Sequence, residues 1–203
     1  MPYNLDPIYD DLCYQGTSIL INRFDVRNGS ELEKIETVVT FVQSAELEKN
    51  PLDGDFDFAH YKAVHKFLFG EIYEWAGEIR AVNISKKGTA FCPHEQINER
   101  AERIFGRLKK MNYFRNLPKD DFVSEIVDFY KITNDLHPFR EGNGRTQRSF
   151  LTMLIRFAGY EINFSEVDVD LLMVATIHSA HGVNDFLHKI FTETIKVPPI
   201  DET

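Results

Sequence analysis

Cysteine is scarce in this chain of 203 residues, and other features are missing altogether. Cys13 and Cys92 are too few for a disulfide framework and lack the spacing of metal ligands, so we expect reduced thiols and a cytoplasmic location. No apolar run is long enough to span a membrane. The first residues, Met1-Pro2-Tyr3-Asn4, show neither the basic nor the apolar region of a signal peptide.

Positive charge is also in short supply. The 23 Lys and Arg residues stand against 32 Asp and Glu residues, a formal net charge of -9. This balance argues against broad nucleic-acid binding and favours specific protein partners. Only 8 Pro and 11 Gly are present, whereas 43% of residues are hydrophobic and 17 are Phe, so the composition predicts one domain, or at most two, with a sizeable core.

The residues that carry chemistry concentrate in one stretch, His137 to Arg148, which reads His-Pro-Phe-Arg-Glu-Gly-Asn-Gly-Arg-Thr-Gln-Arg. Apolar residues precede and follow it at near-helical spacing. The pattern therefore predicts a loop between two helices, with the glycines at the start of the second. A helix N-terminus carries free N–H groups and partial positive charge, which makes it a site for anions.

Several residues of this stretch suit a phosphate ligand. Gly142 and Gly144 let backbone amides approach closely, and Asn143 can add a side-chain donor. Arg145 and Arg148 lie three apart, on one helical face, where two guanidinium groups can grip a polyphosphate. Taken singly, each arginine would more simply be a solvated residue at a helix start. The combination favours a nucleotide phosphate site.

The same stretch offers a metal ligand and a base. Glu141 provides carboxylate oxygens for a hard cation such as Mg²⁺, which usually keeps water and bridges phosphates. His137 can accept a proton near neutral pH. Alone, His137 would be an ordinary surface histidine, but its place beside the phosphate site makes it the candidate base.

The run resembles the signature of the Fic family, HPFx(D/E)GNGRxxR, at every specified position. Residues 65–80 resemble the helix and turn that precede the target-binding flap of that family. The resemblance covers roughly residues 20–195. It implies a mainly α protein with the Fic fold, a helical bundle with a small β-hairpin flap. We expect an N-terminal extension over 1–29, a Fic domain over 30–195 and a C-terminal tail over 196–203.

The resemblance also implies an activity, the transfer of AMP from ATP to a hydroxyl side chain of a target protein. The residues implied are the catalytic base His137, the Mg²⁺ ligand Glu141, the nucleotide-binding residues Gly142, Asn143, Gly144, Arg145 and Arg148, and the loop anchor Phe139. Two alternatives stay open. In the first, the chain is a binding module that uses the same fold. In the second, it is a Fic enzyme that transfers another group, since family members also transfer phosphate, UMP or phosphocholine.

A hairpin is predicted over residues 79–92, where Ile79, Val82, Ile84 and Phe91 surround a tip rich in lysine and glycine. The plain interpretation is a short surface hairpin. The resemblance favours a flap with an exposed edge that captures a target segment by strand addition. Its target-binding residues would be Ile84, Ser85, Lys86, Lys87, Gly88 and Thr89.

The first helix should begin at Ser30, an N-cap whose capping box is completed by Glu33. Its core-facing residues are predicted to be Ile35, Val38, Val39, Val42 and Leu47. His60 and His65 lie five apart, off one helical face, so we expect buried or rim histidines rather than a metal pair. Further helices are expected over 57–68, 93–111, 119–136, the end of the signature to 157, 167–179 and 183–195.

Regulation is suggested by what is missing. Fic enzymes are commonly inhibited by a helix with the motif (S/T)xxxE(G/N), whose glutamate pairs with the second signature arginine, here Arg148. Ser44 and Glu48 have the right spacing, but Lys49 follows them. The chain therefore most resembles the toxin branch that a separate small antitoxin inhibits, and whose targets are type II topoisomerase subunits. Inhibition within the chain through Glu48 is the alternative. We expect no direct nucleic-acid or membrane partner.

Overall fold

The computed structural model of the chain describes residues 4–5, 11–86 and 89–198. The described part contains the α-helices α1 (Gly29–Lys49), α2 (Phe58–Phe69), α3 (Ile97–Lys110), α4 (Lys119–Leu136), α5 (Asn143–Phe157), α6 (Val169–Ala180) and α7 (Asp185–Thr194). Its strands are β1 (Asn4–Leu5), β2 (Ile84–Lys86) and β3 (Thr89–Ala90). The mainly α fold is thus confirmed, and each helix lies where the sequence predicts one.

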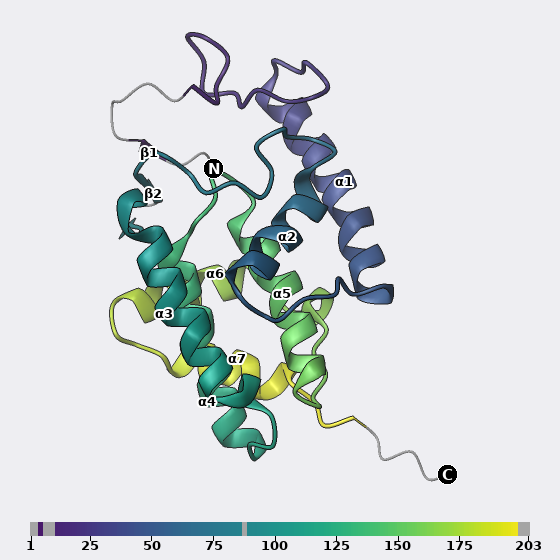
Figure 1. Ribbon diagram of the computed structural model, residues 1–203, viewed down its shortest axis with the longest axis vertical. Helices are drawn as coiled ribbons and strands as arrows, with labels where there is room; N and C mark the ends of the chain where they lie inside the picture. Colours follow the sequence, from purple (N-terminus) through teal and green to yellow (C-terminus); the bar gives the residue numbers. More distant parts are fainter. Residues whose placement is uncertain (1–3, 6–10, 87–88, 199–203) are drawn as a thin grey trace.

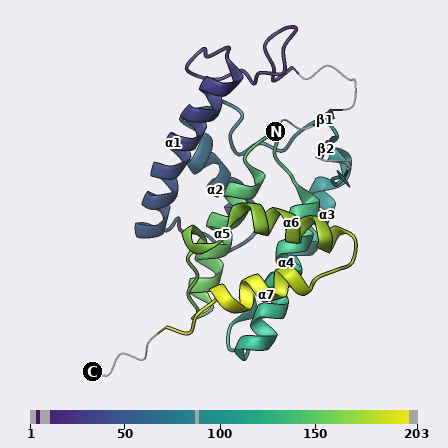
Figure 2. The same cartoon turned by 180° about the vertical axis from the view of Figure 1, so that it is seen from behind.

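Helix α5, which follows the signature loop, lies at the centre of the bundle. Helices α1 and α2 pack against it from one side and α4, backed by α3, from the other (Figure 1). Helices α6 and α7 cover α4 on the opposite face, as the view from behind shows (Figure 2). The loop between α4 and α5 therefore sits where several elements converge.

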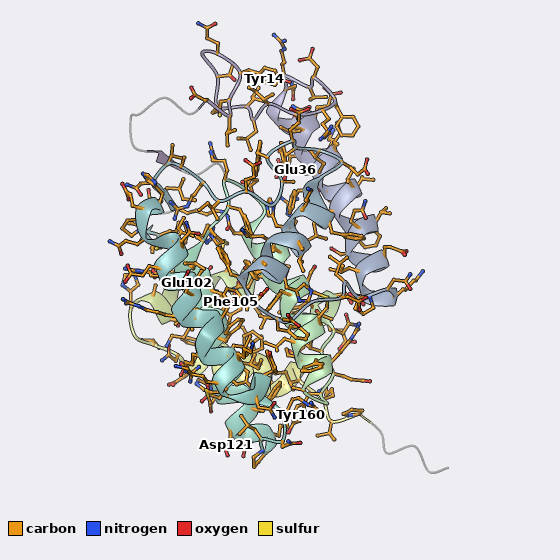
Figure 3. All side chains as sticks on the ribbon, viewed as in Figure 1. Tyr14, Glu36, Glu102, Phe105, Asp121 and Tyr160 are labelled. Carbon is orange, nitrogen blue, oxygen red and sulfur yellow. The ribbon has the colours of Figure 1, made fainter. Side chains whose placement is uncertain are left out.

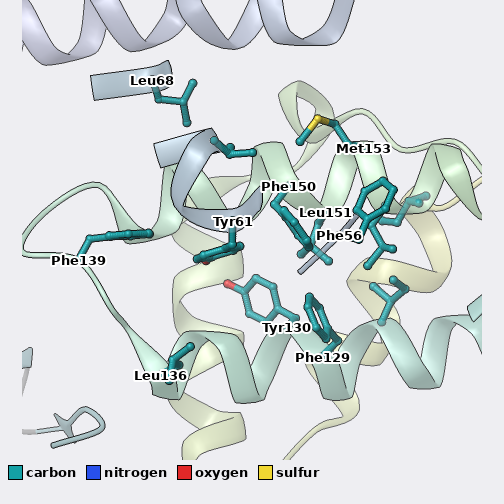
Figure 4. Close-up of a cluster of buried hydrophobic side chains, with 14 of the residues drawn as sticks. Phe56, Tyr61, Leu68, Phe129, Tyr130, Leu136, Phe139, Phe150, Leu151 and Met153 are labelled. Carbon is teal, nitrogen blue, oxygen red and sulfur yellow. The ribbon is translucent and has the colours of Figure 1, made fainter. Parts of the chain in front are cut away.

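One aromatic cluster forms the centre of the core. The ring of Phe150, on α5, packs edge-on against Tyr61 from α2 and Phe56 from the preceding loop, with centroids 5.1 and 5.6 Å apart (Figure 4). Phe129 of α4 stacks on it from the other side of the bundle. Burying each such side chain contributes about 1.5–3 kcal/mol, so this cluster ties α2, α4 and α5 together.

Helix α1 begins differently from the prediction. Its N-cap is Asn28, whose side-chain oxygen accepts hydrogen bonds from the backbone N–H groups of Ser30 and Glu31, both at 3.1 Å. The prediction of Ser30 as N-cap is wrong, because the helix starts at Gly29 and Ser30 already lies inside its first turn. Asparagine is as good a capping residue as serine, so both fit the sequence rule.

The face that α1 turns to the core is also different. The buried residues are Leu32, Glu36, Thr40 and Leu47. Of the predicted core positions Leu47 is correct, but Val38 and Val42 are 64% and 59% exposed. Apolar periodicity predicted the wrong buried face because Glu36 and Thr40 are buried against polar partners inside the protein. The spacing of apolar residues does not show such partners.

The predicted hairpin is present, and a third strand joins it. Strands β2 and β3 pair antiparallel with Ser85 opposite Ala90, and β1 pairs antiparallel with β2, with Asn4 opposite Ser85. The strand order is β1-β2-β3. The edge of β2 that was expected to be exposed is therefore occupied by β1.

Among the described residues, no helix combines the length and the apolar character that crossing a bilayer requires.

Candidate active site

The loop between α4 and α5 is built around two residues with left-handed backbone. His137 ends α4 with φ 40° and ψ 60°, and its N–H group donates to the carbonyl of Thr133 at 3.2 Å. Gly142 begins α5 with φ 80°. A Cβ atom at Gly142 would lie 2.3 Å from the ring of Phe69, so only glycine fits. The chain thus turns sharply twice within the signature, as its Pro and Gly content predicted.

The imidazole of His137, the expected base, is held in one neutral tautomer. Its Nδ1 lies 3.0 Å from the carbonyl oxygen of Asn134, which can only accept, so Nδ1 carries the hydrogen and Nε2 the lone pair. The ring stacks on Phe91 with centroids 3.7 Å apart. Burial lowers the pKa of His137 to about 3, with the nearby charge of Arg80 also lowering it. At neutral pH the ring is therefore uncharged, with Nε2 as its acceptor nitrogen.

Arg80 fastens the hairpin to this loop. Its side chain is almost fully buried, and its Nε donates to the carbonyl of His137 at 2.8 Å. Its two Nη atoms donate to the carbonyls of Val82 and Cys92 at 2.7 and 2.5 Å, and its backbone N–H donates to Pro138 at 2.9 Å. One guanidinium thus bonds both ends of the hairpin to the base-bearing residue.

His65 of α2 fastens the loop at its other end. The backbone N–H of Gly77 donates to Nδ1 at 2.8 Å, so Nε2 carries the hydrogen and donates to the carbonyl of Glu141 at 3.0 Å. The ring stacks on Phe139 with centroids 3.8 Å apart. Burial lowers the pKa of His65 to about 3, and the ring stays neutral. Sequence reasoning identified a buried histidine here but not its role.

Phe139 and Asn143 keep the loop folded on itself. Phe139 is fully buried between His65 and Tyr61 (Figure 4). The side chain of Asn143 accepts from the N–H of Phe139 at 2.8 Å and donates to its carbonyl at 2.7 Å. Both polar atoms of the Asn143 side chain are therefore used within the loop, and the backbone amides at the start of α5 are what the loop offers to an anion.

The charged residues of the signature have unequal surroundings. Arg145 forms an ion pair with Glu36 of α1 at 2.5 Å and lies 3.5 Å from an oxygen of Glu141. Within the described part of the chain, no carboxylate lies within ion-pair distance of Arg148, whose side chain is half-buried, and burial lowers its pKa. A partly buried cation without a counter-charge suits an anion. Nothing in the local sequence pattern pointed to Glu36.

Arg145 and Arg148 open into a cavity of about 1300 Å³ between α1, α5 and the start of α6. Glu36, Glu141 and Lys86 also line it. This volume accommodates a nucleotide with room to spare. His137 is not part of the cavity wall, because its ring lies under Phe91.

The remaining flap residues are placed as follows. The side chain of Ile84 is buried, that of Thr89 is half-buried, and Ser85 lies in the middle of the sheet between β1 and β3. Lys87 and Gly88 lie outside the described residues. Of the flap residues that the structure describes, only Lys86 lines the cavity.

Among the signature residues, Glu141 is the one that offers a carboxylate to a magnesium ion. One oxygen of Glu141 accepts from the N–H of Gly142 at 2.8 Å. No cluster of three or more His, Cys, Asp or Glu residues that could hold a metal occurs in the described ranges. A single carboxylate fits Mg²⁺, which is bound by one or two carboxylates together with phosphates and water.

Comparison with known proteins places this site in a family. The model of the Fic/DOC family matches residues 55–155, which contain α2, the hairpin and the whole signature. A probable protein adenylyltransferase of Sinorhizobium fredii, y4lH, is 41% identical over 176 residues, which are 86% of this chain and 90% of that protein. The chain belongs to the Fic/DOC family. A probable protein adenylyltransferase Fic of Escherichia coli is 30% identical, and 92% of each chain is covered.

Three further similarities extend the comparison of this Fic protein. Protein adenylyltransferase VbhT of Bartonella schoenbuchensis is 35% identical over 88% of this chain, which spans 37% of VbhT. The BepC protein of Bartonella tribocorum, solved with bound AMPPNP, has a TM-score of 0.85 at 22% identity, covering 93% of this chain and 97% of that one, and shows the fold. The N-terminal Fic domain of a Bartonella quintana protein, solved with bound ADP, has a TM-score of 0.85 at 25% identity, covering 92% and 94%.

Proposed function

We propose that this Fic protein transfers AMP from ATP to a hydroxyl side chain of a target protein. The observation that carries the proposal is the neutral, buried His137, whose Nδ1 is held by Asn134, at the end of a loop that leads to two arginines in a nucleotide-sized cavity. Relatives that match along most of the chain are named protein adenylyltransferases.

In the proposed reaction, the target hydroxyl gives its proton to Nε2 of His137 as its oxygen attacks the α-phosphorus of ATP. A new O–P bond forms, the bond between the α-phosphorus and the oxygen bridging to the β-phosphate breaks, and pyrophosphate leaves. Arg145, Arg148 and the amides at the start of α5 would stabilise the phosphate charge. A magnesium ion held by Glu141, phosphate oxygens and water would supply further charge neutralisation. Catalysis then consists mainly of positioning and electrostatics.

The position of a label in ATP tests this chemistry. We expect protein to become labelled by ATP carrying the label at the α-phosphorus and to stay unlabelled when the label is at the γ-phosphorus. Intact-mass spectrometry should show an increase of one AMP unit. Labelling from the γ position would instead indicate phosphate transfer, and no transfer from either position would indicate a Fic-fold binding module.

The proposal includes regulation by a separate small antitoxin, with the chain acting as a bacterial toxin in the cytoplasm. Arg148 would grip the γ-phosphate of ATP or, in the inhibited state, a glutamate of the antitoxin. The absence of any described carboxylate beside Arg148 supports this, as does the cavity in which Arg148 lies. Type II topoisomerase subunits are the proposed targets, on the resemblance to the toxin branch.

Glu48 is the residue that would inhibit within the chain if the alternative held. In the structure its carboxylate lies 3.5 Å from Arg156, at the exposed end of α1. We therefore expect wild type and Glu48→Gly to transfer AMP at equal rates when purified alone, and expression of either to slow bacterial growth. A silent wild type together with a strongly active Glu48→Gly would show inhibition within the chain.

A further inference from the structure

Glu36 is a buried carboxylate that the signature does not include. It lies on the inner face of α1 (Figure 3), 9% exposed, and lines the cavity. The hydroxyl of Tyr73 donates to one of its oxygens, and the other accepts from Arg145 at 2.5 Å. Tyr73 and Arg145 both bind the Glu36 carboxylate. Glu36 is therefore held in place, and it in turn fixes the position of the Arg145 side chain.

Arg145 has two carboxylates within reach. Glu36 lies at 2.5 Å and Glu141 at 3.5 Å, so the ion pair with Glu36 is the closer one. Thr40 accepts a weaker bond from Arg145 at 3.4 Å, and the ring of Phe69 lies 4.6 Å from the guanidinium carbon. The guanidinium is thus held closer to Glu36 of α1 than to Glu141, the carboxylate of the signature.

We propose that Glu36 is a positioning residue, which acts through Arg145 to hold that guanidinium 3.5 Å from Glu141 rather than in direct contact with it, so that the Glu141 carboxylate stays available to the divalent cation that accompanies the nucleotide. This rests on the proposed function, because it concerns the same site. Without Glu36, Glu141 is the remaining carboxylate within ion-pair distance of Arg145 in the described part of the chain. Arg145 then closes on Glu141 and neutralises the ligand that the cation needs.

The experiment compares five proteins: wild type, Glu36→Gln, Glu36→Ala, Tyr73→Phe and the control Glu33→Gln. Glutamine keeps the size of Glu36 but not its charge, and Tyr73→Phe removes the hydroxyl that fixes Glu36. Glu33 is an exposed glutamate on the same helix that lines the same cavity. The binding of a non-hydrolysable ATP analogue is measured by calorimetry with Mg²⁺ and with a chelator, and thermal melting checks that each variant is folded.

We expect Mg²⁺ to tighten nucleotide binding in wild type, and this gain to shrink about 10-fold in Glu36→Ala and Glu36→Gln, as for other residues that orient a metal ligand. Tyr73→Phe should lie between, and Glu33→Gln should keep the wild-type gain from Mg²⁺. The rate of AMP transfer should fall in the same order, through kcat more than through the KM for ATP. Removal of the charge alone, in Glu36→Gln, distinguishes positioning from a packing role.

Three results would overturn the proposal. One is an unchanged Mg²⁺ gain in both Glu36 variants, and another is the lack of any Mg²⁺ gain in wild type. The third is faster transfer or tighter binding in Glu36→Gln, which would make Glu36 a competitor of phosphate for Arg145. If wild type fails to transfer AMP, the proposed function fails, while the calorimetric comparison still decides the role of Glu36.

Discussion

At the scale of single residues, the loop is held by bonds to its carbonyl groups. Arg80 donates to the carbonyl of His137 and His65 to that of Glu141, so both ends of the loop are fixed from other parts of the chain. Backbone carbonyls thereby orient His137, and its pKa is lowered chiefly by burial and further by the nearby charges of Arg80 and Lys86.

Three histidines are buried, His60, His65 and His137, and burial lowers the pKa of each, which makes stability depend on pH. His65 and His137 have a pKa of about 3 when folded and about 6.5 when unfolded, so acid protonates the unfolded chain first and favours unfolding. Stability is therefore complete above the unfolded pKa and falls as the pH drops toward 3. Each histidine contributes up to about 1.4 kcal/mol per pH unit to the slope.

Urea denaturation at a series of pH values checks this. In His65→Asn the slope between about pH 4 and 5.5 should be shallower than in wild type by about 1.4 kcal/mol per pH unit. The control is His181→Asn, at an exposed turn, which should keep the wild-type slope. An unchanged slope in His65→Asn would mean that His65 is not held neutral in the folded protein.

The signature residues could be identified from the sequence because they lie within twelve consecutive positions and each has a typical chemistry. Their partners could not. His65, Arg80 and Glu36 act on the loop from other elements, and a buried histidine or glutamate gives no local sign of what it contacts. The role of Asn143 was likewise read as a donor to phosphate, whereas its side chain is used by Phe139.

At the scale of elements, the hairpin is the unit that connects the base to the surface. Arg80 and Cys92 tie its two ends to the loop, and Phe91 covers His137. The pairing of β1 with β2 was not predicted, because a two-residue strand at the N-terminus has no detectable alternation. A target segment that adds to the β2 edge has to displace β1, or else it pairs with the outer edge of β3.

Proline at Ser85 tests the hairpin as a target-binding element. Ser85 pairs with Asn4 on one side and Ala90 on the other, so proline removes a donor from the ladder and distorts both pairings. We expect Ser85→Pro to lower the rate of target modification more than it lowers nucleotide affinity. Both can be measured on the same preparation by labelling and calorimetry. Equal losses in the two would mean that the hairpin serves the fold alone.

At the scale of the whole molecule, one core positions every part of the site. Helix α1 supplies Glu36, α2 supplies His65, the hairpin supplies Arg80, and α4 and α5 hold the loop between them. The domain boundary expected at residue 30 does not coincide with a boundary in the packing of the core. Leu20 is buried in the same core, and the N–H of Arg23 donates to the carbonyl of Ile72 at 2.8 Å.

The helices and their order were predictable because apolar periodicity, Gly and Pro marked their ends. The face of α1 was not, because the buried Glu36 and Thr40 are stabilised by partners distant in sequence. The wall of the cavity is polar beside Arg145 because Glu36 and Thr40, rather than Val38 and Val42, face inward. Had Val38 and Val42 faced inward, the guanidinium of Arg145 would have met an apolar surface.

The transfer of AMP with His137 as base is the central claim, and one measurement tests it most directly. Wild type, His137→Ala and His181→Ala are each incubated with a target-containing lysate and with ATP labelled at the α-phosphorus. Removal of a positioned base costs about 100-fold or more in rate, so we expect labelling by wild type and by His181→Ala and almost none by His137→Ala. Calorimetry should show that His137→Ala still binds nucleotide. Undiminished labelling by a folded His137→Ala would contradict the account.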